Sequence, residues 1–285
     1  MIYDINKIVI LVLLLLAPLL CGCVSQGESP SGKVNVVTTI APLSEFILAV
    51  GGDRVEVTVL VPPGAEPHTY EPTPSQMKDV ATADLYVMNG AGIEFWMDKV
   101  LAVNKNMVVI DSSEGAVILQ ESADEIDPHI WTSLRNAARQ VDNICSGLIQ
   151  VDPEYSDYYA RNRDEYLEKL KALDGELNQT FAARTGKTFI VYHPAWTYFA
   201  QDYDLVQVPL LENEKEPGPK YLASIIDLAR ANNITTIFVE PQYNPKSAEV
   251  IAREMKASII VLDPLAQNYL ENMRHSGQEI AKSLK

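Results

Sequence analysis

Short apolar runs rich in β-branched residues alternate along the chain with segments in which apolar residues recur at helical spacing. In the first part of the chain, these runs predict strands at 34–39, 55–61, 85–88 and 107–110. The helical patterns between them cover 41–50, 73–82 and 93–103. Such an alternation is typical of a parallel sheet with helices packed on its faces.

A long polar segment at 154–183 interrupts this alternation. It places Tyr159, Tyr166, Leu170 and Leu173 at helical spacing. A helix of about 30 residues spans about 45 Å, which is longer than one small domain. We therefore expect a helix that connects two lobes; the alternative is two ordinary helices broken near Gly175.

The alternation then resumes. It predicts strands at 188–192, 234–239 and 258–262, and helices at 219–232, 245–256 and 268–284. The chain is therefore predicted to be an α/β protein of two lobes, each a mostly parallel β-sheet flanked by helices, joined by a single long spine helix. We expect the N-terminal lobe at 34–150, the linking helix at 151–185 and the C-terminal lobe at 186–285.

The N-terminus predicts export from the cytoplasm. The apolar run at 8–20 has about 13 residues, which fits a signal peptide and is too short to cross a bilayer. The following Leu-Cys-Gly-Cys resembles a lipobox. We predict a lipoprotein-type signal peptide at 1–22, a lipid anchor at Cys23 and a polar, flexible tether at 23–33, with the folded chain at the outer face of the cell membrane. The alternative is an ordinary signal peptide with incidental cysteines.

Composition excludes several classes of function. The formal net charge is −15, with 38 acidic and 23 basic residues, which argues against binding to nucleic acid or anionic lipid surfaces. Cys145 is the one cysteine of the predicted folded region, so neither a disulfide scaffold nor a cysteine metal site is possible there. The hydrophobic content of 47% is ordinary for a globular protein.

Four metal-ligating residues share one sequence context. His68, His129, His193 and Asp263 each lie beside a proline, about 60 to 70 residues apart. His193 and Asp263 directly follow predicted strands, at the sheet edge where open parallel sheets bind ligands. Rigid backbone beside each ligand lowers the entropy lost when a metal orders the site. Three imidazoles and a carboxylate form a tetrahedral zinc set, so the pattern predicts a metal held between the lobes.

Other residues near these positions have more ordinary interpretations. Glu240 follows a predicted strand and is interpreted as a partner that orients an imidazole or as a structural acid, with direct ligation as the alternative. Glu66 and Glu71 are expected to be solvated loop charges. Trp131 and Trp196 are expected to wall the site. The fourth histidine, His275, is expected at the surface.

Five motifs resemble those of the metal-binding solute receptors of ABC transporters, in the zinc and manganese uptake cluster. They occupy 61–76, 127–131, 192–200, 238–242 and 261–265. The resemblance implies two α/β lobes joined by a long helix, with His68, His129, His193 and Asp263 as ligands. In this family a histidine at the position of His193 is typical of zinc receptors and a glutamate of manganese receptors. The stretch 114–127 has acidic residues where many zinc receptors carry a histidine-rich loop, which leaves broader selectivity open.

The resemblance implies a receptor and not an enzyme. We expect a monomeric, lipid-anchored, extracytoplasmic protein that binds Zn²⁺ as cargo and hands it to a membrane permease powered by a cytoplasmic ATPase. One alternative is a manganese or iron receptor of the same family. Another is a zinc-dependent hydrolase with Glu240 or Glu71 as general base, although the sequence has no His-Glu-x-x-His helix. Surface adhesion is suggested by the anchor alone.

Overall fold

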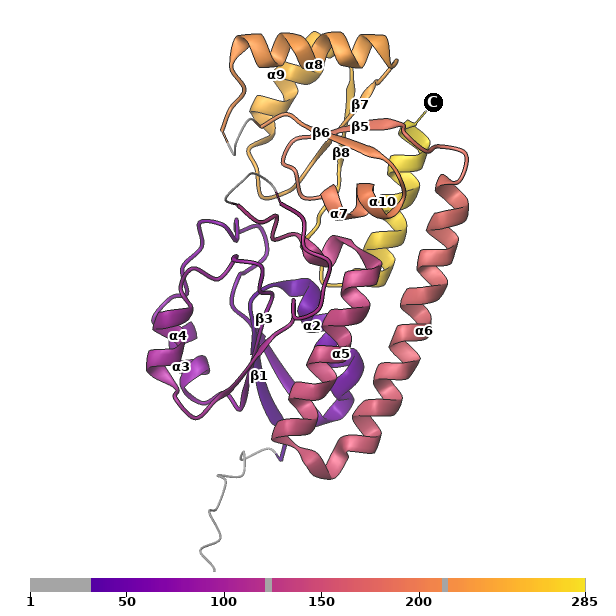
Figure 1. Ribbon diagram of the computed structural model, residues 1–285. Coiled ribbons are helices and arrows are strands. Elements are labelled where there is room, and N and C mark those ends of the chain that lie inside the picture. Colours follow the sequence, from indigo (N-terminus) through magenta and orange to yellow (C-terminus); the bar gives the residue numbers. More distant parts are fainter. Residues whose placement is uncertain (1–31, 121–124, 212–214, 285) are drawn as a thin grey trace, which may run out of the picture. The chain divides into compact units, whose positions relative to one another are not determined.

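The computed structural model describes residues 32–120, 125–211 and 215–284. The predicted signal peptide, Cys23 and most of the predicted tether lie outside these residues. The described chain contains two four-stranded parallel sheets with helices around them, shown in Figure 1. None of the helices in the described ranges is long and apolar enough to cross a membrane.

The first sheet has the strand order β2-β1-β3-β4. Its strands are β1 (Val34–Thr38), β2 (Val55–Val59), β3 (Leu85–Met88) and β4 (Val108–Asp111). The helices of this lobe are α2 (Ala41–Gly51), α3 (Gln76–Ala81), α4 (Met97–Val103) and α5 (Leu134–Val151). In Figure 1, α3 and α4 lie on one side of the sheet and α2 and α5 on the other. The helix predicted at 73–82 is observed from Gln76 to Ala81, and reciprocal hydrogen bonds between Thr73 and Gln76 form the expected capping box at its start.

The second sheet repeats this topology with the order β6-β5-β7-β8. Its strands are β5 (Thr188–Val191), β6 (Val206–Pro209), β7 (Thr236–Val239) and β8 (Ser258–Val261). The accompanying helices are α7 (Thr197–Asp202), α8 (Pro219–Ala231), α9 (Pro245–Met255) and α10 (Tyr269–Ser283). The sequence patterns did not predict β6, which is a short edge strand ending in proline, where a missing N–H is tolerated.

A single helix, α6 (Ser156–Phe181), follows the first lobe and leads into the second. It continues through Gly175, and its buried stripe includes Leu173 and Leu177. It packs against α2 and α5 of the first lobe and against α10, which runs beside it in Figure 1. At Gly277 of α10, a Cβ atom would lie 2.5 Å from Leu177, so glycine permits this close helix contact. The predicted architecture of two parallel-sheet lobes with a long connecting helix is confirmed.

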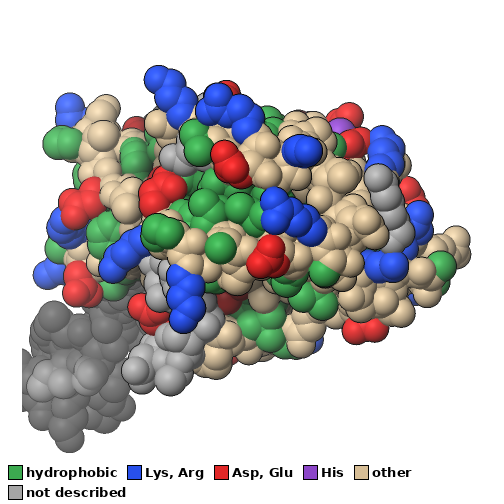
Figure 2. Space-filling view, turned by 90° about the horizontal axis from the view of Figure 1, so that it is seen from above, with side chains coloured by type: hydrophobic (Ala, Val, Ile, Leu, Met, Phe, Trp, Pro, Cys, Tyr) green, Lys and Arg blue, Asp and Glu red, His purple; other side chains and the backbone are tan. Residues whose placement is uncertain are grey.

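One hydrophobic core joins the two lobes. It runs from the first sheet through α5, α6 and α10 to Phe189, Val191 and Phe238 on the second sheet. A separate, smaller core lies between the second sheet and helices α8 and α9. On the face shown in Figure 2, acidic and basic side chains are interspersed, so the net negative charge does not gather there in one patch.

A carboxylate of the first lobe caps a helix of the second. The side chain of Asn268 does not cap the backbone at the N-terminus of α10. Instead, the backbone N–H groups of Tyr269 and Leu270 donate to the carboxylate of Glu45 on α2. The Tyr166 hydroxyl of α6 donates to the same carboxylate at 2.6 Å. Glu45 therefore ties the segment after β8 to both α2 and α6.

Replacing Glu45 by glutamine should destabilise the fold. The amide keeps one acceptor oxygen but loses the charge and the second acceptor at a helix N-terminus, which costs about 1–2 kcal/mol. Urea denaturation of Glu45→Gln should show this loss in the free energy of unfolding. Glu165→Gln, the same change at an exposed position on α6, is the control. Equal stability of the two variants would show that the cap contributes nothing.

Candidate metal centre

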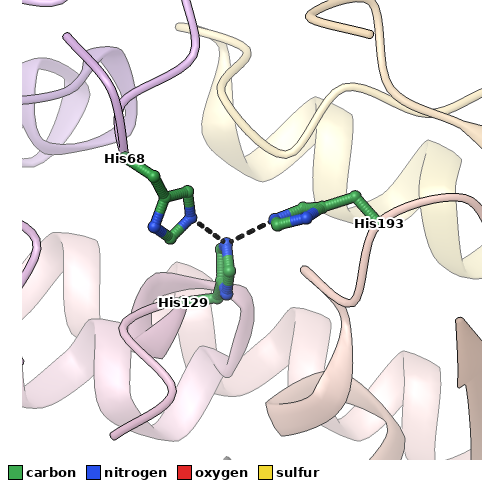
Figure 3. Close-up of side chains that lie close together, drawn as sticks. All are labelled: His68, His129 and His193. Carbon is green, nitrogen blue, oxygen red and sulfur yellow. Dashed lines mark hydrogen bonds between the residues drawn. The ribbon is translucent and has the colours of Figure 1, made fainter. Parts of the chain in front are cut away.

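Three histidines from distant parts of the chain meet at one point (Figure 3). The Nε2 atom of His129 lies 3.2 Å from Nε2 of His68 and 3.0 Å from Nε2 of His193. Each of the three offers one ligand atom within 4.8 Å of the others. His68 follows β2 in the first lobe, whereas His193 follows β5 in the second. The structure therefore brings together the three histidines that the proline contexts single out.

Each of these histidines donates its backbone N–H to a nearby carboxylate. His68 donates to Glu66 at 3.1 Å and His129 to Asp127 at 2.9 Å. His193, after β5, donates to Glu240, after the neighbouring strand β7, at 3.3 Å. The order of the second sheet reverses between these two strands. The position of each imidazole is thus set by its own backbone and an adjacent acid.

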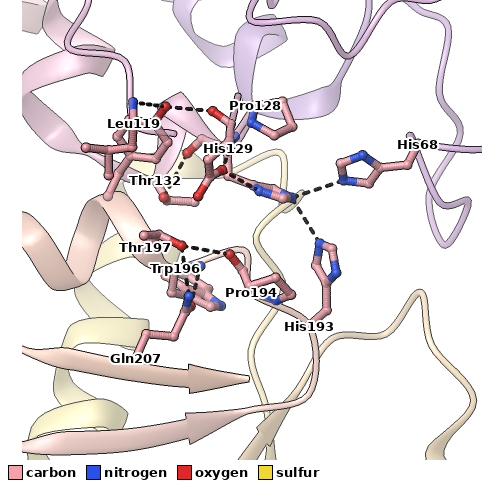
Figure 4. Close-up of polar contacts among 12 residues, drawn as sticks. His68, Leu119, Pro128, His129, Thr132, His193, Pro194, Trp196, Thr197 and Gln207 are labelled. Carbon is pink, nitrogen blue, oxygen red and sulfur yellow. Dashed lines mark hydrogen bonds and ion pairs between the residues drawn. The ribbon is translucent and has the colours of Figure 1, made fainter. Parts of the chain in front are cut away.

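Further hydrogen bonds fix the loops that carry the histidines (Figure 4). The Thr132 hydroxyl donates to the His129 carbonyl at 2.9 Å. After His193, the Thr197 hydroxyl donates to the Pro194 carbonyl at 3.1 Å and accepts from Gln207 at 2.9 Å. Since these contacts satisfy backbone groups that a loop would otherwise leave to water, they restrict movement of the ligand positions.

The ring of His129 is oriented by Asp127. Its Nδ1 atom lies 2.8 Å from Oδ1 of Asp127, and both side chains are buried. An Nδ1–H donated to this carboxylate leaves the Nε2 lone pair facing the other two histidines, as in many metal-binding imidazoles. Burial alone would raise the pKa of Asp127, but the hydrogen bonds and charge of His129 together with the Thr197 hydroxyl hold it below its ordinary value.

Glu240 lines the histidine cavity and is only 1% exposed. Burial raises the pKa of its carboxyl to about 8, against the opposing effect of the His193 charge. Its Oε1 atom has no hydrogen-bond partner in the part of the chain that the structure describes. Tyr243 stacks on the ring of His193, with 5.0 Å between ring centroids. The loop 240–243 therefore supports His193 from two sides.

Asp263, the fourth predicted ligand, is not part of the histidine group. Its Oδ1 atom accepts from Nε2 of Gln242 at 2.9 Å and from the backbone N–H of Leu265 at 3.0 Å. The half-buried side chain of Asp263 lines an adjacent cavity of about 130 Å³, which shares Gln242 and Leu265 with the histidine cavity. Ligation by Asp263 stays a prediction.

The histidine cavity is small. The centre of a water-sized sphere can occupy a volume of only about 10 Å³ in it. This is room for a single small ion or water molecule. Trp131 lines it as expected, whereas Trp196 is buried against Phe199 and does not. Glu66, expected to be a solvated charge, also lines the cavity, with Oε1 3.8 Å from Nε2 of His68.

Glu71 and His275 behave as simple surface residues. Glu71 is an exposed acid paired with Lys99 at 2.8 Å. His275 is exposed on α10. Both positions agree with the interpretation of the sequence.

Glu94 is a buried acid that the sequence patterns did not identify, and it is linked to the loop of His129 through Asn89. Glu94 accepts hydrogen bonds from the Thr39 hydroxyl and from the backbone N–H groups of Asn89 and Gly90. The Asn89 side chain in turn donates to the carbonyl of Pro128 at 3.0 Å. Burial raises the pKa of Glu94 to about 7, although its three donors act in the opposite direction.

The pKa of Glu94 predicts a pH dependence of stability. Between its ordinary value of 4.5 and about 7, the folded protein holds a proton that the unfolded chain releases. The stability that this proton contributes is fully present below about pH 4.5 and is lost as the pH rises through about 7. Wild-type protein should therefore lose more unfolding free energy over this range than Glu94→Gln. Parallel pH profiles would contradict the assignment, and Glu114→Gln, at an exposed site, is the control.

Comparisons with known proteins identify relatives of this chain. The sequence profile of the family described as "Zinc-uptake complex component A periplasmic" matches residues 36–283. The high-affinity zinc uptake system protein ZnuA of Bacillus subtilis (strain 168) is 32% identical over 261 residues, which cover 84% of this chain and 81% of that protein. The manganese-binding lipoprotein MntA of Halalkalibacterium halodurans is 30% identical over 272 residues, which cover 90% of each.

A solved structure shows the same fold. A crystal structure of ZnuA superposes with a TM-score of 0.86 at 40% sequence identity and covers 88% of this chain and 99% of that chain. The match of the family profile extends over nearly all of the described residues. This chain therefore belongs to the family of periplasmic A components of zinc-uptake complexes.

Proposed function

We propose that this protein is an extracytoplasmic receptor that binds Zn²⁺ through His68, His129 and His193, with Asp263 as the fourth ligand, and delivers it to an ABC transporter. The spacing of the imidazole nitrogens supports this most directly. Tetrahedral zinc with Zn–N bonds of about 2.0–2.1 Å requires nitrogens about 3.3–3.4 Å apart. The Nε2 separations of 3.2 and 3.0 Å are close to that requirement.

Zinc fits the donor set better than manganese or iron. Imidazole suits zinc, whereas manganese favours carboxylate, carbonyl and water oxygens. The family description and the name of the Bacillus subtilis relative also support zinc. Manganese is the second candidate, because a relative of similar identity is named a manganese-binding lipoprotein.

The site supports binding and release of an ion, not catalysis. The family is one of metal-uptake components. Of the two acids considered as general bases, Glu240 lines the histidine cavity but accepts a hydrogen bond from the backbone of His193, and Glu71 pairs with Lys99 at the surface. A hydrolase is therefore not proposed.

The remaining parts of the proposal concern location and partners. Cys23 is the proposed lipid anchor at the outer face of the membrane, which the lipoprotein name of the MntA relative supports. The proposed partner is a membrane permease with its cytoplasmic ATPase, and the receptor is proposed to act as a monomer. The mixed charges on the face shown in Figure 2 give no sign of a nucleic-acid surface there.

Purified protein freed of metal by a chelator should bind one Zn²⁺ per chain and melt at a higher temperature with zinc. Loss of a residue that only hydrogen bonds to a metal ligand typically weakens metal binding about 10–100-fold. His193→Ala should weaken zinc binding by more than this, because it removes a proposed ligand itself. His275→Ala, the same change at an exposed histidine, should bind like wild type. Isothermal titration calorimetry measures the zinc affinity of the wild type and of both variants. Equal affinity of the two variants would refute the site.

Competition should reveal the selectivity. When Mn²⁺ and Zn²⁺ are offered together to the chelator-treated protein, zinc should displace manganese completely at equal concentrations, because three neutral imidazoles favour the later metal of the Irving–Williams order. Elemental analysis after gel filtration gives the bound fractions. Retention of manganese under these conditions would assign the cargo to manganese instead.

A further inference from the structure

We infer that Gln242 is a positioning residue that holds the Asp263 carboxylate at the edge of the metal site, with Oδ1 bound to its amide and Oδ2 left to contact the ion. This inference rests on the proposed function, in which Asp263 completes the ligand set. Gln242 occupies the wall that the histidine cavity shares with the larger cavity beside it. It is therefore, beside the apolar Leu265, the polar side chain that lines both the histidine cavity and the cavity of Asp263.

The two oxygens of the Asp263 carboxylate differ in their hydrogen bonds. Both donors, Nε2 of Gln242 and the backbone N–H of Leu265, are directed at Oδ1, at 2.9 and 3.0 Å. Among the described residues, no donor contacts Oδ2. One oxygen is thus held by the protein while the other can bind a cation, which is the usual arrangement of a ligating carboxylate with an outer hydrogen-bond partner.

The backbone at Asp263 and Pro264 is held by hydrogen bonds, so adjustment must come from the side chain. The Asp263 carbonyl accepts from the Asn272 side chain at 2.8 Å. The next carbonyl, of Pro264, accepts from the indole N–H of Trp131 at 2.7 Å. The torsions of the side chain therefore set where Oδ2 points, and the hydrogen bond from Gln242 to Oδ1 holds them.

Gln242 also couples the carboxylate to His193. It belongs to the loop 240–243, in which Glu240 accepts from the backbone of His193 and Tyr243 stacks on its ring. One short segment after β7 therefore positions both ligand candidates of the second lobe. Loss of the Gln242 amide would leave the carboxylate free to adopt other rotamers, and metal binding would then cost more side-chain entropy.

The test measures zinc affinity by competition with a chelator for wild type, Gln242→Met, Asp263→Ala and the double variant. Methionine keeps the length of the side chain but removes the donor. Gln242→Met should bind zinc about 10–100-fold more weakly than wild type. The double variant should bind like Asp263→Ala alone, because Gln242 acts through Asp263. Gln267→Met, at an exposed position in the wall of the same neighbouring cavity, should leave affinity unchanged.

A second readout separates positioning from folding. Without metal, Gln242→Met should melt like wild type, and the visible spectrum of its Co²⁺ complex should shift toward that of Asp263→Ala, because both lose the same carboxylate ligand. Unchanged zinc affinity in Gln242→Met, or additive losses in the double variant, would overturn the inference and leave the receptor function intact. Failure of wild type to bind zinc would overturn both.

Discussion

The convergence of three imidazole nitrogens on one small cavity is the constraint on which the rest of the structure depends. Two of the Nε2 separations, 3.0 and 3.2 Å, are already near the edge length of a zinc tetrahedron. Holding three polar rings this close has a cost in lost freedom and in desolvation. The hydrogen bonds and packing around the rings offset that cost, so the proposed ligands would need little reordering when an ion binds.

Most of the polar contacts around the site serve this preorganisation. Asp127 fixes the ring of His129, and Glu94 acts on the same loop through Asn89 and the Pro128 carbonyl. In the second lobe, the loop 240–243 supports His193. The shared hydrophobic core around α5, α6 and α10 then holds the two halves of the site together. Of the three proposed histidine ligands, His68 has the most exposed side chain.

The sequence predicted the architecture and the histidines for clear physical reasons. Strand and helix periodicities report burial directly, so the two sheets and the spine could be expected. His193 follows an apolar strand, and that position alone places it at the ligand-binding edge of a parallel sheet. In contrast, β6 was missed because a short edge strand with Pro209 carries little periodic signal.

The supporting residues could not be predicted in the same way. Glu94 and Gln242 act through contacts with residues distant in sequence, such as Thr39 and Asp263, and nothing adjacent to them in the sequence indicates those partners. The hydrogen bonds of the Asp263 carboxylate could likewise not be predicted from the sequence. Its position after a strand indicates where its backbone lies but not which donors bind its side chain. Glu66 was taken for a solvated charge, since only the turn that carries His68 brings it to the cavity.

X-ray absorption spectroscopy at the zinc edge of the zinc-loaded protein tests the central claim most directly. The account predicts three imidazole nitrogens in the first coordination sphere, at about 2.0–2.1 Å, with a single oxygen donor beside them. A first sphere with one imidazole or none, or one made of oxygens alone, would contradict it.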